Sequence, residues 1–395
     1  MTTRRVGHDF ELASDRPILL VHAPDRGRRL IERLAGRRPL FVCTVAHTET
    51  AEIDGLSAAG ATAELRRLTA AADAEALHWG RPRCMAGVPS NPLGAPGPVI
   101  ITIAALRLAC IPVQVLDAGL RVKPDAPTRV LADRWGESIV TGRAVSNAAE
   151  LLRVGRELGA ELAEAADYLI LAESVPAGTT TALALLCGLG LDAWGKVSSS
   201  MPENAHPLKG QVVRRALRAA GLDGARATTW QGNRDPVGMV AAVGDPMQPV
   251  VAGLALAAHR RVPVLLGGGS QMAAVLALIA ALADRQGEPL DLDRLAIATT
   301  SWVARDPTAD LAGLVRQIGN IPVFASDLDF GQSRHRPLRR YEERLVKEGV
   351  GAGAAVVAAS LAVDATRATL TAAIETVYEE VYDLPPGPVA ARILQ

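Results

Sequence analysis

The chain contains a polar loop whose residue types suit the binding of an anion. Residues 173–181 read Glu-Ser-Val-Pro-Ala-Gly-Thr-Thr-Thr, and they lie between the apolar run YLILA and the apolar segment TALALLCGLG. If these flanks are a strand and a helix, the loop amides and hydroxyls converge on the positive end of the helix dipole, which favours a phosphate. The GK[ST] sequence of a Walker P-loop is absent, so the pattern favours a monophosphate over triphosphate hydrolysis. A helix N-cap is the alternative, because threonine is favoured there too.

A second candidate loop follows the apolar run VPVLL. Residues 267–269 are three consecutive glycines, and Ser270 comes directly after them. Glycines let a backbone approach a ligand closely, and Ser270 is suited to capping the helix that follows. A purely structural turn explains the same residues, so this loop on its own does not define a site.

The third candidate is a carboxylate, Glu348, in front of a glycine-rich turn. The segment Lys-Glu-Gly-Val-Gly-Ala-Gly leads from Glu348 into the apolar helix pattern VVAASLAV. Little side-chain bulk surrounds such a carboxylate, and burial would raise its pKa towards the range useful to a general base. The alternative is a solvated helix end.

The remaining polar residues do not form another recognisable centre. Glu203 and His206 approach the spacing of metal ligands, but the prolines at 202 and 207 argue against a helix there, and we predict no metal site. A GxSxG elbow is absent, which disfavours a serine hydrolase. The four cysteines lie far apart in apolar segments, as expected of reduced core thiols: Cys43, Cys84, Cys110 and Cys187.

The elements that must position these loops alternate along the chain. Short apolar runs are followed by turns and then by helical patterns, an order that predicts an α/β fold with a parallel sheet and helices on both faces. The runs are ILLVHA, LFVCTV, VIITIAALRLA, IPVQVLDAG, YLILAES, VPVLLGGGS, LAIATTSW and IPVFASDLD. The candidate helices are 143–165, 180–190, 207–221, 248–260, 270–285, 308–318 and 350–381. We predict one domain over residues 1–395, with a core of about 98–345 and a smaller helical part from about 1–97 and 346–395.

Composition excludes several classes of function. The chain has 395 residues, 49% of them hydrophobic, and 42 basic residues balance 42 acidic ones. A net charge of zero gives no basic excess for a nucleic acid or a membrane surface, so neither is expected as a partner. No apolar stretch reaches the ~20 residues of a membrane span, and the N-terminus does not read as a signal, so we expect a cytoplasmic protein.

Five ordered segments together resemble a known family. They are HTETAEIDGLSAAGATAELRRLTAAADAE, ESVPAGTTTALALL, VSSSMPENAHPLK, GDPMQPVVAGLALAAHRRVPVLLGGG and FGQSRHRPLRRYEERLVKEGVGAGAA. They look like the archaeal and cyanobacterial branch related to nicotinate-nucleotide:dimethylbenzimidazole phosphoribosyltransferase, an enzyme of cobalamin biosynthesis. The resemblance runs from about Pro17 to Leu361.

The resemblance implies a fold, a reaction and a partner. The fold is a Rossmann-like parallel sheet with a smaller helical portion, and the protein is paired as a homodimer. The reaction moves the phosphoribosyl group of nicotinate mononucleotide to an aromatic base, giving α-ribazole phosphate and nicotinate when the base is dimethylbenzimidazole. No metal or redox cofactor is implied.

The resemblance also assigns roles to residues of this chain. Glu348 matches the catalytic glutamate. The phosphate- and nucleotide-binding positions are Glu173, Gly178, Thr179, Thr180, Thr181, Gly267, Gly268 and Gly269. Ser57 borders the base pocket, and His47 replaces a small residue near it, so we expect the histidine to influence which base is accepted.

Two other hypotheses remain open. The same donor could serve a different acceptor, such as a purine, a phenol or another azole, because a phosphate loop is indifferent to the base. A nucleotide-binding sensor without turnover would keep the phosphate loop and form no product with any acceptor.

Overall fold

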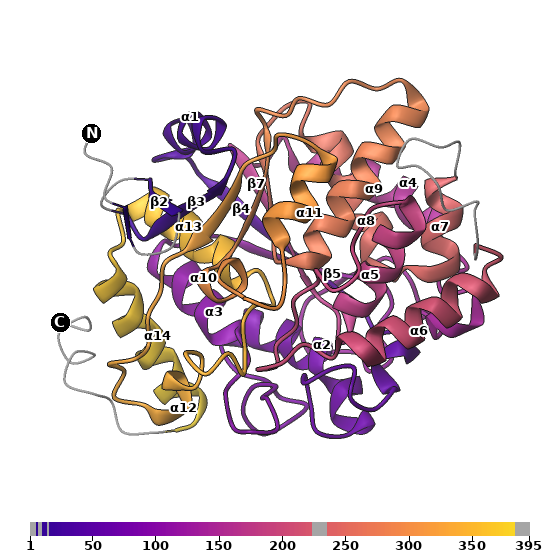
Figure 1. Ribbon diagram of the computed structural model, residues 1–395. Coiled ribbons are helices and arrows are strands. Elements are labelled where there is room, and N and C mark those ends of the chain that lie inside the picture. The colour runs from indigo at the N-terminus through magenta and orange to yellow at the C-terminus, as the bar shows by residue number, and fades with distance from the viewer. Residues whose placement is uncertain (1–4, 7–9, 14–15, 223–234, 384–395) are drawn as a thin grey trace.

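The computed structural model describes residues 5–6, 10–13, 16–222 and 235–383 (Figure 1). The domain predicted for residues 1–395 therefore includes segments outside the described residues. Within the described residues no helix combines the length and the apolar character required to cross a bilayer.

A sheet of ten strands forms the centre of the described structure, in the order β1-β2-β3-β10-β9-β8-β7-β4-β5-β6. The seven strands from β10 to β6 are parallel, and β1 to β3 form an antiparallel edge. Their bounds are β1 Arg5–Val6, β2 Phe10–Leu12, β3 Ile18–His22, β4 Pro39–Val45, β5 Val113–Asp117, β6 Arg129–Val130, β7 Tyr168–Ser174, β8 Val264–Gly267, β9 Leu295–Thr300 and β10 Val323–Ser326. The predicted α/β fold with a largely parallel sheet is confirmed. The run ILLVHA, however, is antiparallel to β10.

Helices cover both faces of the sheet, because successive side chains of a buried strand point to opposite sides. In β7, Leu169 and Leu171 face one core, and Tyr168 and Ile170 face the other. The first face is covered by α4 Ala148–Leu162, α5 Gly178–Leu189, α6 His206–Ala219, α7 Pro236–Val243, α8 Met247–Ala258, α9 Ser270–Gln286 and α11 Leu311–Ile318. The second is covered by α1 Pro24–Leu34, α2 Ala63–Trp79, α3 Val99–Leu108, α13 Ala352–Val363 and α14 Arg367–Val381. Short helices complete the described structure: α10 Ser301–Ala304, α12 Arg336–Arg339 and the 3-10 turns η1 Glu49–Glu52 and η2 Ile139–Thr141.

Two expectations about elements are corrected. The run VIITIAALRLA is not a strand but helix α3, which packs against α13 and α14 and so is apolar on all sides. The candidate helix 350–381 is two helices, α13 and α14, because the chain turns at Asp364, which has a positive φ of 50°.

The parallel strands end at one edge of the sheet, and the loops that follow them meet there. Strand β7 ends at Glu173 and Ser174, and β9 ends at Thr299 and Thr300. The turn after Glu348 reaches the same edge, since the Val350 amide donates a hydrogen bond to the Glu173 carbonyl at 3.0 Å. Three segments far apart in the sequence thus converge beyond the strand ends.

Candidate active site

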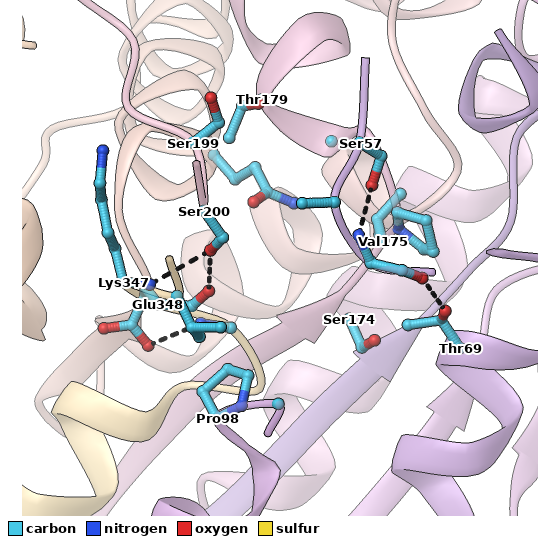
Figure 2. A pocket seen from close by; sticks show the side chains of 18 of the residues that line it. Ser57, Thr69, Pro98, Ser174, Val175, Thr179, Ser199, Ser200, Lys347 and Glu348 are labelled. Atoms are coloured by element: carbon cyan, nitrogen blue, oxygen red, sulfur yellow. Dashed lines mark hydrogen bonds between the residues drawn. The ribbon is translucent and has the colours of Figure 1, made fainter. Parts of the chain in front are cut away.

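A partly enclosed pocket of about 140 Å³ lies at this edge of the sheet. Figure 2 shows Thr179 and Ser199 on one side of it and Glu348 and Pro98 on the other. The pocket adjoins a more open groove of about 910 Å³, with which it shares Ser57 and other lining residues. An enclosed part joined to an open part gives room for two small molecules side by side.

Glu173 projects into the pocket from the end of β7. Its carboxylate accepts hydrogen bonds from Gln271 Nε2 at 2.7 Å and from the Val175 amide at 3.0 Å. Gly178 is required for this arrangement, because a Cβ there would lie 2.0 Å from Gln271 Nε2. Burial, with Asp245 and Glu348 adding like charge, raises the pKa of Glu173 to about 8. At neutral pH this group is therefore mostly a neutral carboxylic acid.

Glu348 lies in the turn before α13 and is partly accessible from the pocket. Its carboxylate accepts hydrogen bonds from the Gly349 and Gly353 amides at 3.2 and 3.3 Å and from Thr299 Oγ1 at 3.3 Å. These bonds favour the charged form, but the surrounding protein outweighs them, and burial raises the pKa of Glu348 to about 7. A carboxylate with this pKa is suited to accept a proton near neutral pH.

Thr179 stands in the first turn of α5, where the helix dipole is positive. Its hydroxyl accepts a hydrogen bond from Lys209 Nζ at 2.8 Å, and Lys209 is fully buried. Burial, with a contribution from Lys347, lowers the pKa of Lys209 to about 7. An anionic group bound at this helix N-terminus would favour the protonated form of the Lys209 amine.

A second buried lysine, Lys347, is itself among the lining residues, whereas Lys209 only contacts one of them. Lys347 Nζ forms an ion pair with Asp306 Oδ2 at 2.7 Å, and both side chains are inaccessible to solvent. Burial opposes the charge on Asp306, but hydrogen bonds from Lys347 and Ser198 hold the pKa of Asp306 well below its usual range. The charge of Lys347 is therefore balanced by the carboxylate of Asp306. Lys209 instead has a hydroxyl, that of Thr179, as its hydrogen-bond partner among the described residues.

The structure brings together about half of the residues selected from the sequence. Six line the pocket: Ser57, Glu173, Gly178, Thr179, Gly269 and Glu348. The other five do not: His47, Thr180, Thr181, Gly267 and Gly268. Thr181 Oγ1 instead contacts Asp245 at 2.5 Å, Thr180 is buried, and a Cβ on Gly267 would lie 2.9 Å from Ala354. These three residues pack α5 and α13 against their neighbours.

His47 lies elsewhere than the base pocket in which it was expected. Its Nε2 is 3.3 Å from Glu52 Oε1, and Glu52 is also bound by Arg67 and Arg121. The main-chain bonds of His47 to Gly119 and Gly136 turn the segment towards β5 and β6. Burial lowers the pKa of His47, so a neutral imidazole packed against an ion-pair cluster is the better description.

The sequence analysis gave no role to several residues at the site, although Ser174 and Lys347 lie in two of its candidate segments. They are Asp73, Ser174, Lys209, Gln271 and Lys347, all of which either line the pocket or contact a lining residue. Lys209 belongs to an amphipathic pattern, in which a lysine is expected on the solvent side. Gln271 could have been found from its position directly after the glycine loop. Within the described residues no group of three or more His, Cys, Asp or Glu is arranged to hold a metal ion.

Comparison with known proteins bears on the fold and the family of the chain. A family model described as "Phosphoribosyltransferase" matches residues 100–286. UPF0284 proteins of Gloeobacter violaceus and Methanothermobacter thermautotrophicus are 47% and 44% identical, over 89% and 84% of this chain and 91% and 90% of their own lengths. The crystal structure of CobT from Thermus thermophilus aligns with a TM-score of 0.55 at 20% identity, covering 91% of this chain and 92% of that one. A structure of nicotinate-nucleotide-dimethylbenzimidazole phosphoribosyltransferase from the same organism gives 0.54 with the same identity and coverage.

The sheet and its covering helices define an α/β protein with the fold of the CobT structure. The relatives from Gloeobacter violaceus and Methanothermobacter thermautotrophicus match this chain over most of its length at more than 40% identity, which establishes the family. The chain belongs to the UPF0284 family.

Proposed function

We propose that this protein transfers the phosphoribosyl group of nicotinate mononucleotide to the ring nitrogen of an aromatic base, releasing nicotinate. One observation carries the proposal: the pocket is lined on one side by Thr179, at a helix N-terminus and hydrogen-bonded to the buried amine of Lys209, and on the other by a carboxylate with its pKa raised to about 7. The first suits a phosphate and the second suits a proton that must be removed.

The proposed reaction requires a group that binds the phosphate and a general base, and it requires no general acid. Nicotinate mononucleotide carries a cationic pyridinium on its anomeric carbon, so the pyridine nitrogen departs as a neutral amine and requires no general acid. The acceptor nitrogen attacks from the opposite face and inverts that carbon. The N–H on the other nitrogen of the acceptor ring becomes acidic as the new bond forms, and we expect Glu348 to take that proton. Holding both reactants in one pocket supplies the remaining acceleration through orientation.

The acceptor proposed first is dimethylbenzimidazole or a similar azole, which would place the protein in cobalamin biosynthesis. The family resemblance and the structural neighbour named for that reaction support this choice. We also expect a homodimer, which light scattering on the purified protein will test.

The test of function is nicotinate release from nicotinate mononucleotide in the presence of dimethylbenzimidazole. The Glu348→Gln variant keeps the shape of the side chain and cannot accept the proton, so we expect turnover to fall by ~100-fold or more. Below about pH 7 the rate of the unmodified protein should fall as Glu348 becomes protonated. The matched control is Glu343→Gln, on an exposed side chain five residues earlier, and it should leave the rate unchanged.

Unchanged turnover in Glu348→Gln would exclude the proposed role of Glu348. Nicotinate release with none of a panel of azoles, purines and phenols, together with retained binding of nicotinate mononucleotide by calorimetry, would instead indicate a nucleotide-binding sensor. Release with a purine or a phenol, and not with dimethylbenzimidazole, would keep the reaction class and change the acceptor.

A further inference from the structure

A third carboxylate lines the pocket and has no part in the proposed reaction. Asp73, on α2, is only 5% exposed and lies among the lining residues together with Ser174. Successive residues of a strand face opposite sides of the sheet, so Ser174 points towards α2 whereas Glu173 points towards α9. The pocket thus has carboxylates on both sides of the end of β7.

Only one of the two carboxylate oxygens of Asp73 accepts a hydrogen bond among the described residues. Ser174 Oγ donates to Asp73 Oδ2 at 2.7 Å, and among the described residues the structure gives the other oxygen, Oδ1, no hydrogen-bond partner. Neighbouring donors are already engaged: Thr69 Oγ1 bonds to the Ala59 carbonyl and Tyr341 Oη to the Pro96 carbonyl. Burial raises the pKa of Asp73 to about 7, which reflects the poor solvation of this group. Because Oδ1 is not among the solvent-inaccessible atoms, water can reach it in the absence of a base; once a base excludes that water, the oxygen costs free energy unless the base supplies a donor.

The placement of Asp73 relates it to the acceptor and not to the phosphate. Figure 2 shows Thr179 on one side of the pocket, with Glu348 and Ser174 separated from each other across the other side. Since Asp73 contacts Ser174, a flat base that presents its attacking ring to Glu348 turns another edge towards Asp73. Methyl groups on that edge would leave the carboxylate oxygen unpaired, whereas a hydroxyl or amino group would satisfy it.

We propose that Asp73, held by Ser174, determines acceptor specificity by accepting a hydrogen bond from an N–H or O–H group of the base, on an edge away from the attacking nitrogen. The substrate class is then a fused aromatic azole with a hydroxyl or amino substituent, in preference to one that carries only methyl groups. This inference rests on the proposed function.

The experiment measures base binding without turnover. The protein is saturated with ribose 5-phosphate, which has no leaving group, and titrated by calorimetry with 5-hydroxybenzimidazole, adenine and 5,6-dimethylbenzimidazole. We expect at least one of the two donor-bearing bases to bind ~10-fold or more tightly than dimethylbenzimidazole, because a carboxylate oxygen left unpaired by the methyl groups weakens binding. Equal or tighter binding of dimethylbenzimidazole than of both others, or no binding of either of them, overturns the proposal.

Three variants distinguish a role of Asp73 in recognising the base from a role in stabilising the fold. Asp73→Asn keeps an acceptor for Ser174 but turns an amide donor to the pocket, so the preference for donor-bearing bases should disappear. Ser174→Ala keeps the carboxylate, and the preference should persist. Glu75→Gln is the matched control, since Glu75 is on the same helix but bonds to the Arg83 and Cys84 amides, and it should leave the ratio unchanged.

The outcomes of this experiment and of the functional test are distinguishable. An Asp73→Asn variant that folds and loses affinity for all three bases equally overturns the assignment. If that variant does not fold, the ranking of bases by the unmodified protein decides. Expected base binding without nicotinate release contradicts the proposed function and leaves the role of Asp73 in base recognition standing.

Discussion

Burial of Lys209 lowers the pKa of its amine, and so links the protonation of this residue to the binding of an anion. Its ammonium group is fully enclosed, and burial, aided by the charge of Lys347, lowers its pKa to about 7 even though Asp306 acts in the opposite direction. A phosphate held at the N-terminus of α5 would supply a counter-charge and favour the protonated lysine. Binding of a phosphorylated donor and protonation of Lys209 are therefore expected to be coupled.

The Lys209→Met variant tests this coupling at the scale of one residue. Methionine fills a similar volume without a charge, so the fold should be retained while the KM for nicotinate mononucleotide rises ~10-fold or more, as expected for the loss of a hydrogen bond to a charged group. Steady-state kinetics with nicotinate riboside, which lacks the phosphate, should show little change. A similar loss with both donors would contradict a phosphate contact. Lys196→Met, at a lysine paired with Asp192 near the surface, is the control.

The site residues divide into those that the sequence reveals and those that only the fold brings together. Glu348 and Thr179 stand next to glycines or at a strand-to-helix turn, where local pattern alone indicates a ligand. Asp73 is in an alanine-rich helix and reaches the pocket only because α2 packs beside the end of β7. Such a long-range contact leaves no local signal. The resemblance put His47 near the base pocket, but a match in sequence does not fix the direction of a side chain, and main-chain bonds to Gly119 and Gly136 draw this segment towards β5 and β6.

At the scale of elements, apolar runs identified the central strands correctly and α3 incorrectly. Strands β7, β8 and β9 are short runs bounded by turns, as expected for buried parallel strands. Helix α3 is equally apolar because α13 and α14 cover it, and periodicity cannot distinguish a fully buried helix from a strand. The antiparallel direction of β3 also had no local signal, since strand direction depends on the connections between elements.

The contact between α13 and β9 positions Glu348, and Gly353 permits it. A Cβ on Gly353 would lie 2.0 Å from the backbone carbonyl of Thr299, while the Gly353 amide donates to the Glu348 carboxylate. We expect Gly353→Ala to lower the free energy of unfolding by about 2 kcal/mol or more through overpacking. Because α13 must shift away from β9, nicotinate release should fall as well. Urea denaturation and the nicotinate assay measure the two effects.

Gly210→Ala is the matched control for this element. A Cβ there meets only the flexible end of Arg214 at 3.3 Å, so the gain in helix propensity should stabilise α6 by ~0.5–1 kcal/mol. Equal stability of Gly353→Ala and the unmodified protein would show that α13 does not require this close approach.

For the molecule as a whole, grouping buried carboxylates at one edge of the sheet has a consequence for stability. Burial raises the pKa of Asp73 to about 7, of Glu173 to about 8 and of Glu348 to about 7. Each binds a proton more tightly in the folded protein than in the unfolded chain, whose carboxyl pKa values are near 4. Their contribution to stability is therefore complete below about pH 4 and is lost as the pH rises through 7 to 8. His22 and His47 act in the opposite direction below about pH 6.5, because burial lowers their pKa values.

Asp245, whose pKa burial raises to about 6, acts with these three carboxylates, whereas Lys209, whose pKa burial lowers to about 7, acts with the two histidines. Four carboxylates against three basic groups lead us to expect the free energy of unfolding to decrease between pH 5 and pH 7 in the absence of ligand. Removing one titrating carboxylate isolates the effect: Glu173→Gln keeps an oxygen that can accept the hydrogen bond of Gln271 and should show a shallower decrease. Urea denaturation at several pH values measures both slopes. The control is Glu157→Gln, on an exposed side chain of α4, whose slope should match that of the unmodified protein. Parallel slopes for all three proteins would mean that Glu173 titrates alike in the folded and unfolded states, and that the pocket does not hold its acid protonated.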